Sequence, residues 1–245
     1  MANIYEIEMN MLAAEAESER FWKPYAEWCR TRARRLTEQA EIIAGQFSEA
    51  ARQWPFDERK RFAVWLVNST GVAIERCGGQ RYQSRFSYSG PRMFDSRTVV
   101  DVVVRPTLAE WRNTDPSNPE PCFWIALYEE DFWSNLQEAR RLDPMHGPSN
   151  EAFVVQNIRG IEYNQHELPS GYIDDPADDL ITLTEAEVLL AHAVDPRVRQ
   201  TLSQRIDTLR ATAEDWIGLR EQLRGLGWEA RASIWKVRPP RVRTS

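Results

Sequence analysis

Hydrophobic residues at intervals of three and four predict a long amphipathic helix near each end of the chain. The first is expected over residues 24–52, and the second from Pro196 to the glycines at 225 and 227. Their apolar stripes are Trp22, Ala26, Cys29, Ala33, Leu36, Ala40, Ile43, Phe47 and Ala50, and Leu202, Ile206, Leu209, Ala213, Trp216, Leu219, Leu223 and Leu226. Such a stripe must be buried against another surface. Packing within the chain is favoured, and coiled-coil-like packing between chains is the alternative.

The region between these helices is predicted to contain β-strands. Residues 81–88 alternate between two kinds of side chain, which is the period of a half-buried strand. Residues 98–105 are rich in valine, which favours a central strand. Residues 122–128 form a short apolar run that is read as another strand. Further strands are expected at residues 72–76, 152–163 and 230–237.

The predicted fold class is therefore α+β, with a central, mostly antiparallel or mixed sheet flanked by the long N- and C-terminal amphipathic helices. Thr184 is expected to open a helix whose capping box Glu187 completes. A last strand that returns to the sheet would make residues 1–245 a single domain. Its parts are an N-terminal helical region (1–54), a strand-rich middle (55–181) and C-terminal helices with the final strand (182–245). Shorter helices are expected at residues 3–19, 57–68, 106–112 and 131–142.

Composition and charge narrow the function classes. The chain has 245 residues, of which 42% are hydrophobic and 28% charged, as in ordinary globular proteins. A net charge of -6 argues against attraction of the whole surface to nucleic acid or anionic membranes, although local basic patches remain possible. Among 31 basic residues, lysine occurs only at 23, 60 and 236, which is typical of a GC-rich bacterial genome. Ten tryptophans are many for this length, and tryptophan is common both in cores and at contact surfaces.

The cysteines and the N-terminal segment favour a cytoplasmic location. Cys29, Cys77 and Cys122 lie far apart and form no metal-ligand or disulfide pattern. The first 19 residues are acidic and do not resemble a signal peptide. The longest apolar run, residues 62–67, is too short to cross a bilayer, so no membrane association is expected.

The densest cluster of acidic residues lies at residues 172–179. Asp175 followed by Pro176 is typical of a helix start, with Asp175 as N-cap and Asp178 in the first turn. The alternative is a divalent-metal site for a hydrolase or nuclease, formed by Asp174, Asp175, Asp178 and Asp179. The structural interpretation is favoured.

Two groups of arginines are candidates for binding nucleic acid or an acidic partner. The first follows the predicted strand and the second lies in the basic C-terminal tail. Their members are Arg81, Arg85 and Arg92, and Arg238, Arg241 and Arg243. Aromatic residues interleave with the first group, as in single-strand binders. Strand alternation would send arginines and aromatics to opposite faces, so a solvated arginine face is the simpler interpretation.

No nucleophile motif, dinucleotide fingerprint, phosphate loop or zinc-protease motif occurs in the sequence. No cofactor is expected, and no catalytic residue can be nominated. We therefore predict a non-enzymatic cytoplasmic interaction protein: an adaptor, inhibitor or assembly component. It would bind a protein partner or form a homo-oligomer through its long helices and through exposed tryptophans among Trp111, Trp124 and Trp133.

Overall fold

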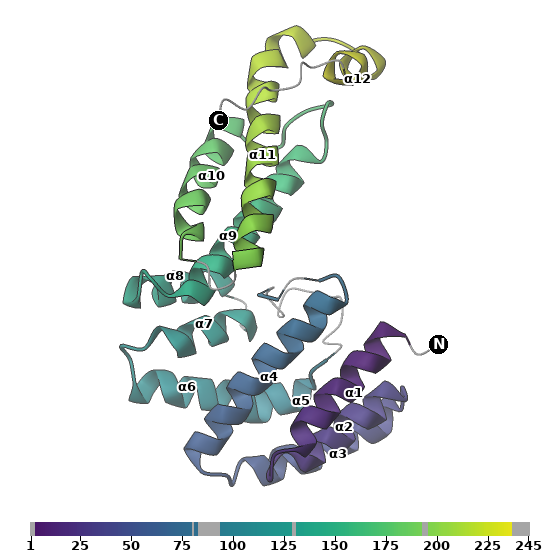
Figure 1. Cartoon of the computed structure of the whole chain (residues 1–245), viewed down its shortest axis with the longest axis vertical. Helices are drawn as coiled ribbons and strands as arrows, with labels where there is room; N and C mark the ends of the chain where they lie inside the picture. The colour runs from purple at the N-terminus through teal and green to yellow at the C-terminus, as the bar shows by residue number, and fades with distance from the viewer. Residues whose placement is uncertain (1–2, 80, 83–93, 129–130, 193–195, 237–245) are drawn as a thin grey trace. The chain divides into compact units, whose positions relative to one another are not determined.

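A computed structural model gives the fold, and Figure 1 shows it. It describes residues 3–79, 81–82, 94–128, 131–192 and 196–236. These residues form helices and no strand. The chain divides into two compact units, Met1–Pro144 and Met145–Ser245.

The predicted α+β fold with a central sheet is wrong, because the described residues form an all-α protein. The first unit contains α1 (Ile4–Glu17), α2 (Lys23–Ala33), α3 (Thr37–Ala51), α4 (Phe56–Arg76), α5 (Arg97–Val99), the π-helical turn η1 (Val100–Val104), α6 (Arg105–Thr114), α7 (Pro119–Tyr128) and α8 (Phe132–Leu142). The second contains α9 (Gly147–Gln165), α10 (Pro176–Leu190), α11 (Pro196–Leu223) and α12 (Trp228–Lys236).

Each predicted strand that falls on described residues is helical. Residues 72–76 are the last turn of α4, and residues 152–163 lie inside α9. The expected final strand at 230–237 is α12 as far as Lys236. Of residues 81–88, only 81 and 82 are among the described residues, so this prediction lies almost wholly outside them.

Burial on a helical face explains why the valine-rich segment at residues 98–105 is not a strand. Its fully buried residues follow helical spacing and continue into α6: Val99, Val100, Val103, Val104 and Leu108. The Ser96 side chain caps this run by accepting a bond from Val99 N at 3.4 Å. Strand propensity is a weak preference that packing of this kind overrides. The π-turn ends two residues before Pro106, which has no N–H to donate to the preceding turn.

The apolar run at residues 122–128 forms most of α7 because a helix can also be apolar on all sides. Every residue of this run except Ile125 is buried. A helix buried all round shows no 3.6-residue period, so its sequence cannot be distinguished from that of a buried strand.

The first long helix predicted from the sequence is two helices. α2 ends at Ala33, and α3 begins at Thr37. Between them Arg35 has φ +62°, a left-handed conformation that a continuing α-helix does not contain. The Leu36 amide then donates to the Thr31 carbonyl at 3.2 Å, which closes the turn.

An aromatic cluster forms the centre of the first unit, where α2, α3 and α4 meet. Tyr25, Phe47 and Phe62 are each at most 1% exposed, and their ring centroids lie 5.1–5.3 Å apart. Trp22, Trp54 and Trp65 surround them. Three of the ten tryptophans therefore belong to this core.

The second unit is a bundle of α9, α10 and α11, and the long helix predicted from Pro196 is confirmed as α11. These helices pack through the apolar residues Val154, Ile158, Ile161, Leu183, Ala186, Leu190, Leu202, Ile206 and Leu209. α12 follows α11, and its Arg231 Nε donates to the Leu226 carbonyl at 2.8 Å. The capping box predicted at Thr184 is wrong, because α10 begins at Pro176 and the Thr184 hydroxyl donates to the Leu180 carbonyl within the helix.

Candidate functional site

The first helix carries two apolar faces. Its inner face, formed by Met9, Leu12, Ala13 and Ala16, is buried. On the outer side Ile4, Ile7 and Met11 are 51%, 47% and 40% exposed. Steps of three and four residues align them along the helix. We call these three residues the α1 stripe. Single exposed apolar residues are ordinary, but an aligned group is typical of a contact surface.

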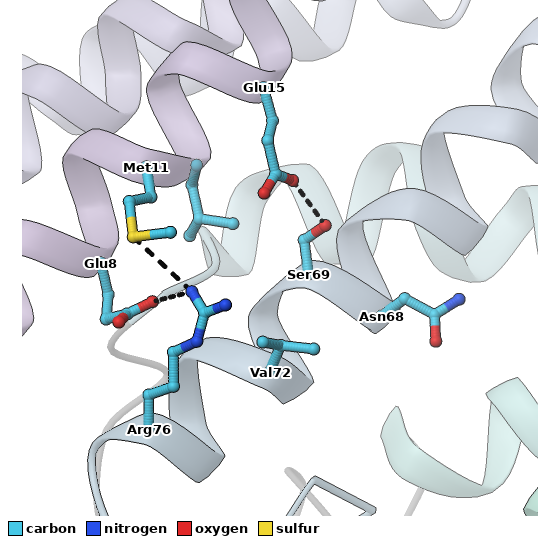
Figure 2. Close-up of a pocket in the computed structure, with 8 residues that line it drawn as sticks. Glu8, Met11, Glu15, Asn68, Ser69, Val72 and Arg76 are labelled. Atoms are coloured by element: carbon cyan, nitrogen blue, oxygen red, sulfur yellow. Dashed lines mark hydrogen bonds and ion pairs between the residues drawn. The ribbon is translucent and has the colours of Figure 1, made fainter. Parts of the chain in front are cut away.

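A pocket of about 110 Å³ lies beside this stripe, between α1 and α4 (Figure 2). It is lined by Glu8, Met11, Leu12 and Glu15 from α1, and by Asn68, Ser69, Val72 and Arg76 from α4. Met11 belongs both to the stripe and to the pocket wall. The stripe and the pocket therefore form one continuous surface.

An ion pair closes one end of the pocket. Arg76 Nη1 lies 3.2 Å from Glu8 Oε2 and 3.6 Å from the sulfur of Met11 (Figure 2). The Glu8 side chain is only 7% exposed, whereas that of Arg76 is 48% exposed. A carboxylate buried to this extent needs a charged partner, and Arg76 supplies it.

A second carboxylate stands at the other end of the pocket without a cation beside it. Glu15 Oε2 accepts hydrogen bonds from Ser69 Oγ at 2.9 Å and from Trp65 Nε1 at 3.0 Å. Both donors are neutral, and Figure 2 shows the first of these bonds. Among the described residues no basic side chain pairs with Glu15. The carboxylate is thus oriented by its donors while its charge stays unbalanced.

Charge on α1 is of one sign. The helix contains no basic residue. Its acidic residues are Glu6, Glu8, Glu15 and Glu17. Around the pocket, Arg76 offsets Glu8 and leaves the negative charge of Glu15. The surface therefore combines exposed apolar side chains with a net negative charge.

Two of the four aspartates singled out in the sequence, Asp175 and Asp179, have structural partners in the second unit. Asp175 caps α10 by accepting a bond from the Ala177 amide at 3.0 Å, which confirms its predicted role as N-cap. Asp174 and Asp178 are exposed, whereas Asp179 is buried. In the described residues, no group of three or more histidine, cysteine, aspartate or glutamate side chains could hold a metal ion.

Asp179 belongs to a polar network that joins α9, α10 and α11. Tyr172 Oη donates to Asp179 Oδ2 at 2.6 Å, and Asn164 Nδ2 donates to Oδ1 at 3.1 Å. Gln165 Nε2 donates both to Tyr172 Oη at 2.8 Å and to the Leu209 carbonyl at 2.9 Å. Burial raises the pKa of Asp179, and the bonds from Tyr172 and Asn164 partly oppose that rise. Burial, followed by the bond to Asp179, raises the pKa of Tyr172.

The predicted tryptophan contacts fall in different environments. Trp111 and Trp124 are 5% and 4% exposed, and the Lys60 ammonium lies 3.8 Å from the centre of the Trp111 ring. Trp133, on α8, is 43% exposed. Only Trp133 of the three therefore offers a large surface for contact.

The predicted arginine groups are described only in part. Arg81 Nε lies 3.8 Å from Glu75 Oε2. The other predicted members, Arg85, Arg92, Arg238, Arg241 and Arg243, lie outside the described residues. The structure therefore brings none of these arginines together in a described site.

A larger and more open cavity of about 680 Å³ lies among α6, α7 and α8. Its two arginines are already engaged: Arg105 Nη1 lies 2.8 Å from Asp101 Oδ1, and Arg112 Nη1 donates to Asn135 Oδ1 at 3.2 Å. Asp131 also lines this cavity, and its charge together with that of Asp101 offsets the charges of the two arginines.

Sequence reasoning missed the residues of the α1 surface. Ile4 and Ile7 could have been noticed, because α1 carries more apolar residues than one buried face requires. No local signal joins Glu15 to Trp65 and Ser69, which are 50 and 54 residues away in the chain.

Comparison with models of protein families, with curated proteins and with solved structures finds no match to this chain. In the part of the chain that the structure describes, no helix combines the length and the apolar character needed to cross a bilayer.

Proposed function

We propose that this chain is a non-enzymatic cytoplasmic interaction protein that binds a protein partner, or a second copy of itself, through the α1 stripe and the adjoining pocket. One observation carries the proposal: Ile4, Ile7 and Met11 are aligned and exposed on a helix whose opposite face is already buried. An apolar surface of this kind, rimmed by charged groups, is characteristic of protein contacts.

The expected energy of such a contact is substantial. Complete burial of a large apolar side chain contributes roughly 1.5–3 kcal/mol. Since each of the three side chains is about half exposed, their burial would contribute roughly 1 kcal/mol each. A few anchors of this size, surrounded by a polar rim, commonly dominate a protein interface.

The test places a photo-crosslinking amino acid in the full-length chain at position 7. A matched control places it at Ile42, which is 62% exposed on α3 of the same unit. We expect a discrete crosslinked product from position 7 that is absent from position 42. Introducing Met11→Glu into the position 7 variant should abolish it. Light scattering over a concentration series identifies a product formed between two copies.

The proposal is overturned if position 7 yields no product beyond that seen at position 42 and the chain stays monomeric at every concentration. A product that survives Met11→Glu would also count against it, because Met11 lies at the centre of the proposed surface.

A further inference from the structure

We infer that the pocket between α1 and α4 receives a lysine or arginine side chain of the partner, and that the partner presents it on an amphipathic helix. This inference rests on the proposed function and adds the chemistry of the partner to it. Its basis is the oriented, unbalanced carboxylate of Glu15 beside an apolar stripe.

The geometry of Glu15 suits a cation. Trp65 Nε1 and Ser69 Oγ both donate to Oε2, so Oε1 keeps its lone pairs for another donor. Two fixed bonds hold the side chain in place before a partner arrives, which lowers the entropy lost on binding. An ammonium or guanidinium group would then form a charge-assisted hydrogen bond.

The pocket has the size and lining for one long basic side chain. Its volume of about 110 Å³ is well below the roughly 300 Å³ at which pockets for drug-sized ligands begin. Met11, Leu12 and Val72 give its wall an apolar part. Lysine and arginine bury their methylene stems against such a surface while the charged head reaches a polar group.

Arg76 does not oppose this occupant. Its guanidinium is bound to Glu8, so the two charges offset each other. Glu15 then leaves the lining with a net negative charge. A basic segment is therefore the complementary partner, whereas an acidic segment, a nucleic acid or an anionic lipid surface would be repelled.

The α1 stripe supplies the second half of the recognition. Ile4 and Glu15 are eleven residues apart, which is about three turns and roughly 16 Å of helix. Met11 lies one turn before Glu15, so the apolar residues and the carboxylate follow the same side of α1. A helix of three to four turns with an apolar face and a basic residue near one end matches this layout.

The test uses the full-length chain and two dye-labelled, amidated helical peptides of equal length. Both carry the same leucine face, and the remaining positions are arginine in one peptide and glutamine in the other. Fluorescence anisotropy in moderate salt gives the dissociation constants. We expect the arginine peptide to bind at least tenfold more tightly than the glutamine peptide.

Glu15→Gln should weaken binding of the arginine peptide about tenfold and leave the glutamine peptide unaffected. The amide oxygen can still accept from Trp65 and Ser69, and an unchanged circular dichroism spectrum and melting temperature will verify the fold. The matched control is Glu6→Gln, which removes the same charge from the same helix. Glu6 and Glu15 are nine residues apart, which is two and a half turns of helix. Glu6 therefore faces the side of α1 opposite to Glu15. Its effect should stay within twofold.

Equal affinity for the two peptides would overturn this inference while leaving an apolar contact through α1 intact. Equal weakening by Glu6→Gln and Glu15→Gln would overturn it too, because the attraction would then belong to the helix as a whole. If neither peptide binds, the inference of a basic helical partner is wrong. The crosslinking experiment at position 7 then still tests the proposed interaction function independently.

Discussion

Replacing Tyr172 with phenylalanine should destabilise the second unit in a way that depends on pH. The substitution removes the hydroxyl that donates to the buried Asp179 at 2.6 Å and accepts from Gln165 at 2.8 Å. A hydrogen bond to a charged group contributes about 1.5–3 kcal/mol to stability. Because Tyr172 is only partly buried, water can replace some of that bond, and we expect a loss of about 1.5 kcal/mol at pH 7.

The sign of the pH dependence follows from the raised pKa of Asp179. Its pKa in the folded state lies above the ordinary value of 3.8, so the folded state binds more protons than the unfolded state in the window above that value. Stability contributed by this group is therefore present at low pH and falls as pH rises through the folded-state pKa. The bond from Tyr172 lowers the pKa of Asp179, so Tyr172→Phe raises that pKa further. The variant therefore loses more stability than the wild type as pH rises.

Urea unfolding of the wild type and the variant at pH 4 and pH 7, followed by circular dichroism, measures both effects. The difference in unfolding free energy should be larger at pH 7 than at pH 4, because a protonated Asp179 tolerates the missing donor better. The contributions of other titrating groups to the unfolding free energy are the same in both proteins, so they cancel in the difference. A difference below about 0.5 kcal/mol, or one that does not change with pH, would refute the reasoning.

Three other substitutions test the rest of the structure. Phe62→Ala should cost about 3–5 kcal/mol of stability, because it opens a cavity in the aromatic cluster, and a smaller loss in urea unfolding would contradict the described core. Asp175→Ala should cost about 1 kcal/mol through loss of the α10 cap, measured by thermal unfolding, whereas Asp174→Ala should change stability little. Ile7→Glu should alter the unfolding free energy by less than about 0.5 kcal/mol, since Ile7 is 47% exposed, and a strong loss would show that it belongs to the core.

Sequence patterns identified several helices that have one buried face and failed at α7, where burial is nearly complete. They also failed at α9 and α12, which were predicted as strands although neither helix is wholly buried. α8 and α11 were predicted because their apolar residues recur every three to four positions beside a polar face. α7 was missed because nearly all its residues are buried, so the period disappears. The valine-rich segment was assigned to a strand on propensity, although its buried residues follow the helical period once it is extended into α6.

The first long helix failed for a different reason. Its apolar stripe continues from α2 into α3 with intact spacing, so the pattern contained no sign of an interruption. The turn depends on one backbone conformation at Arg35, a residue that rarely adopts positive φ. Periodicity indicates which side chains share one face, and here it runs unbroken through the turn, although Leu36 at the turn is 41% exposed.

The acidic residues show why a conspicuous motif can mislead a search for function. The aspartates at 174–179 stand together in the sequence, yet Asp175 caps α10 and Asp179 joins the bundle helices. Glu15 stands apart from any motif, and its environment arises only when α4 brings Trp65 and Ser69 beside it. Two donors from α4 hold Glu15 in place beside the exposed apolar residues of α1, whereas the exposed Asp174 and Asp178 have no such arrangement around them among the described residues. That distinction depends on tertiary contacts, and it is the reason for placing the candidate surface on α1 instead of on the aspartate cluster.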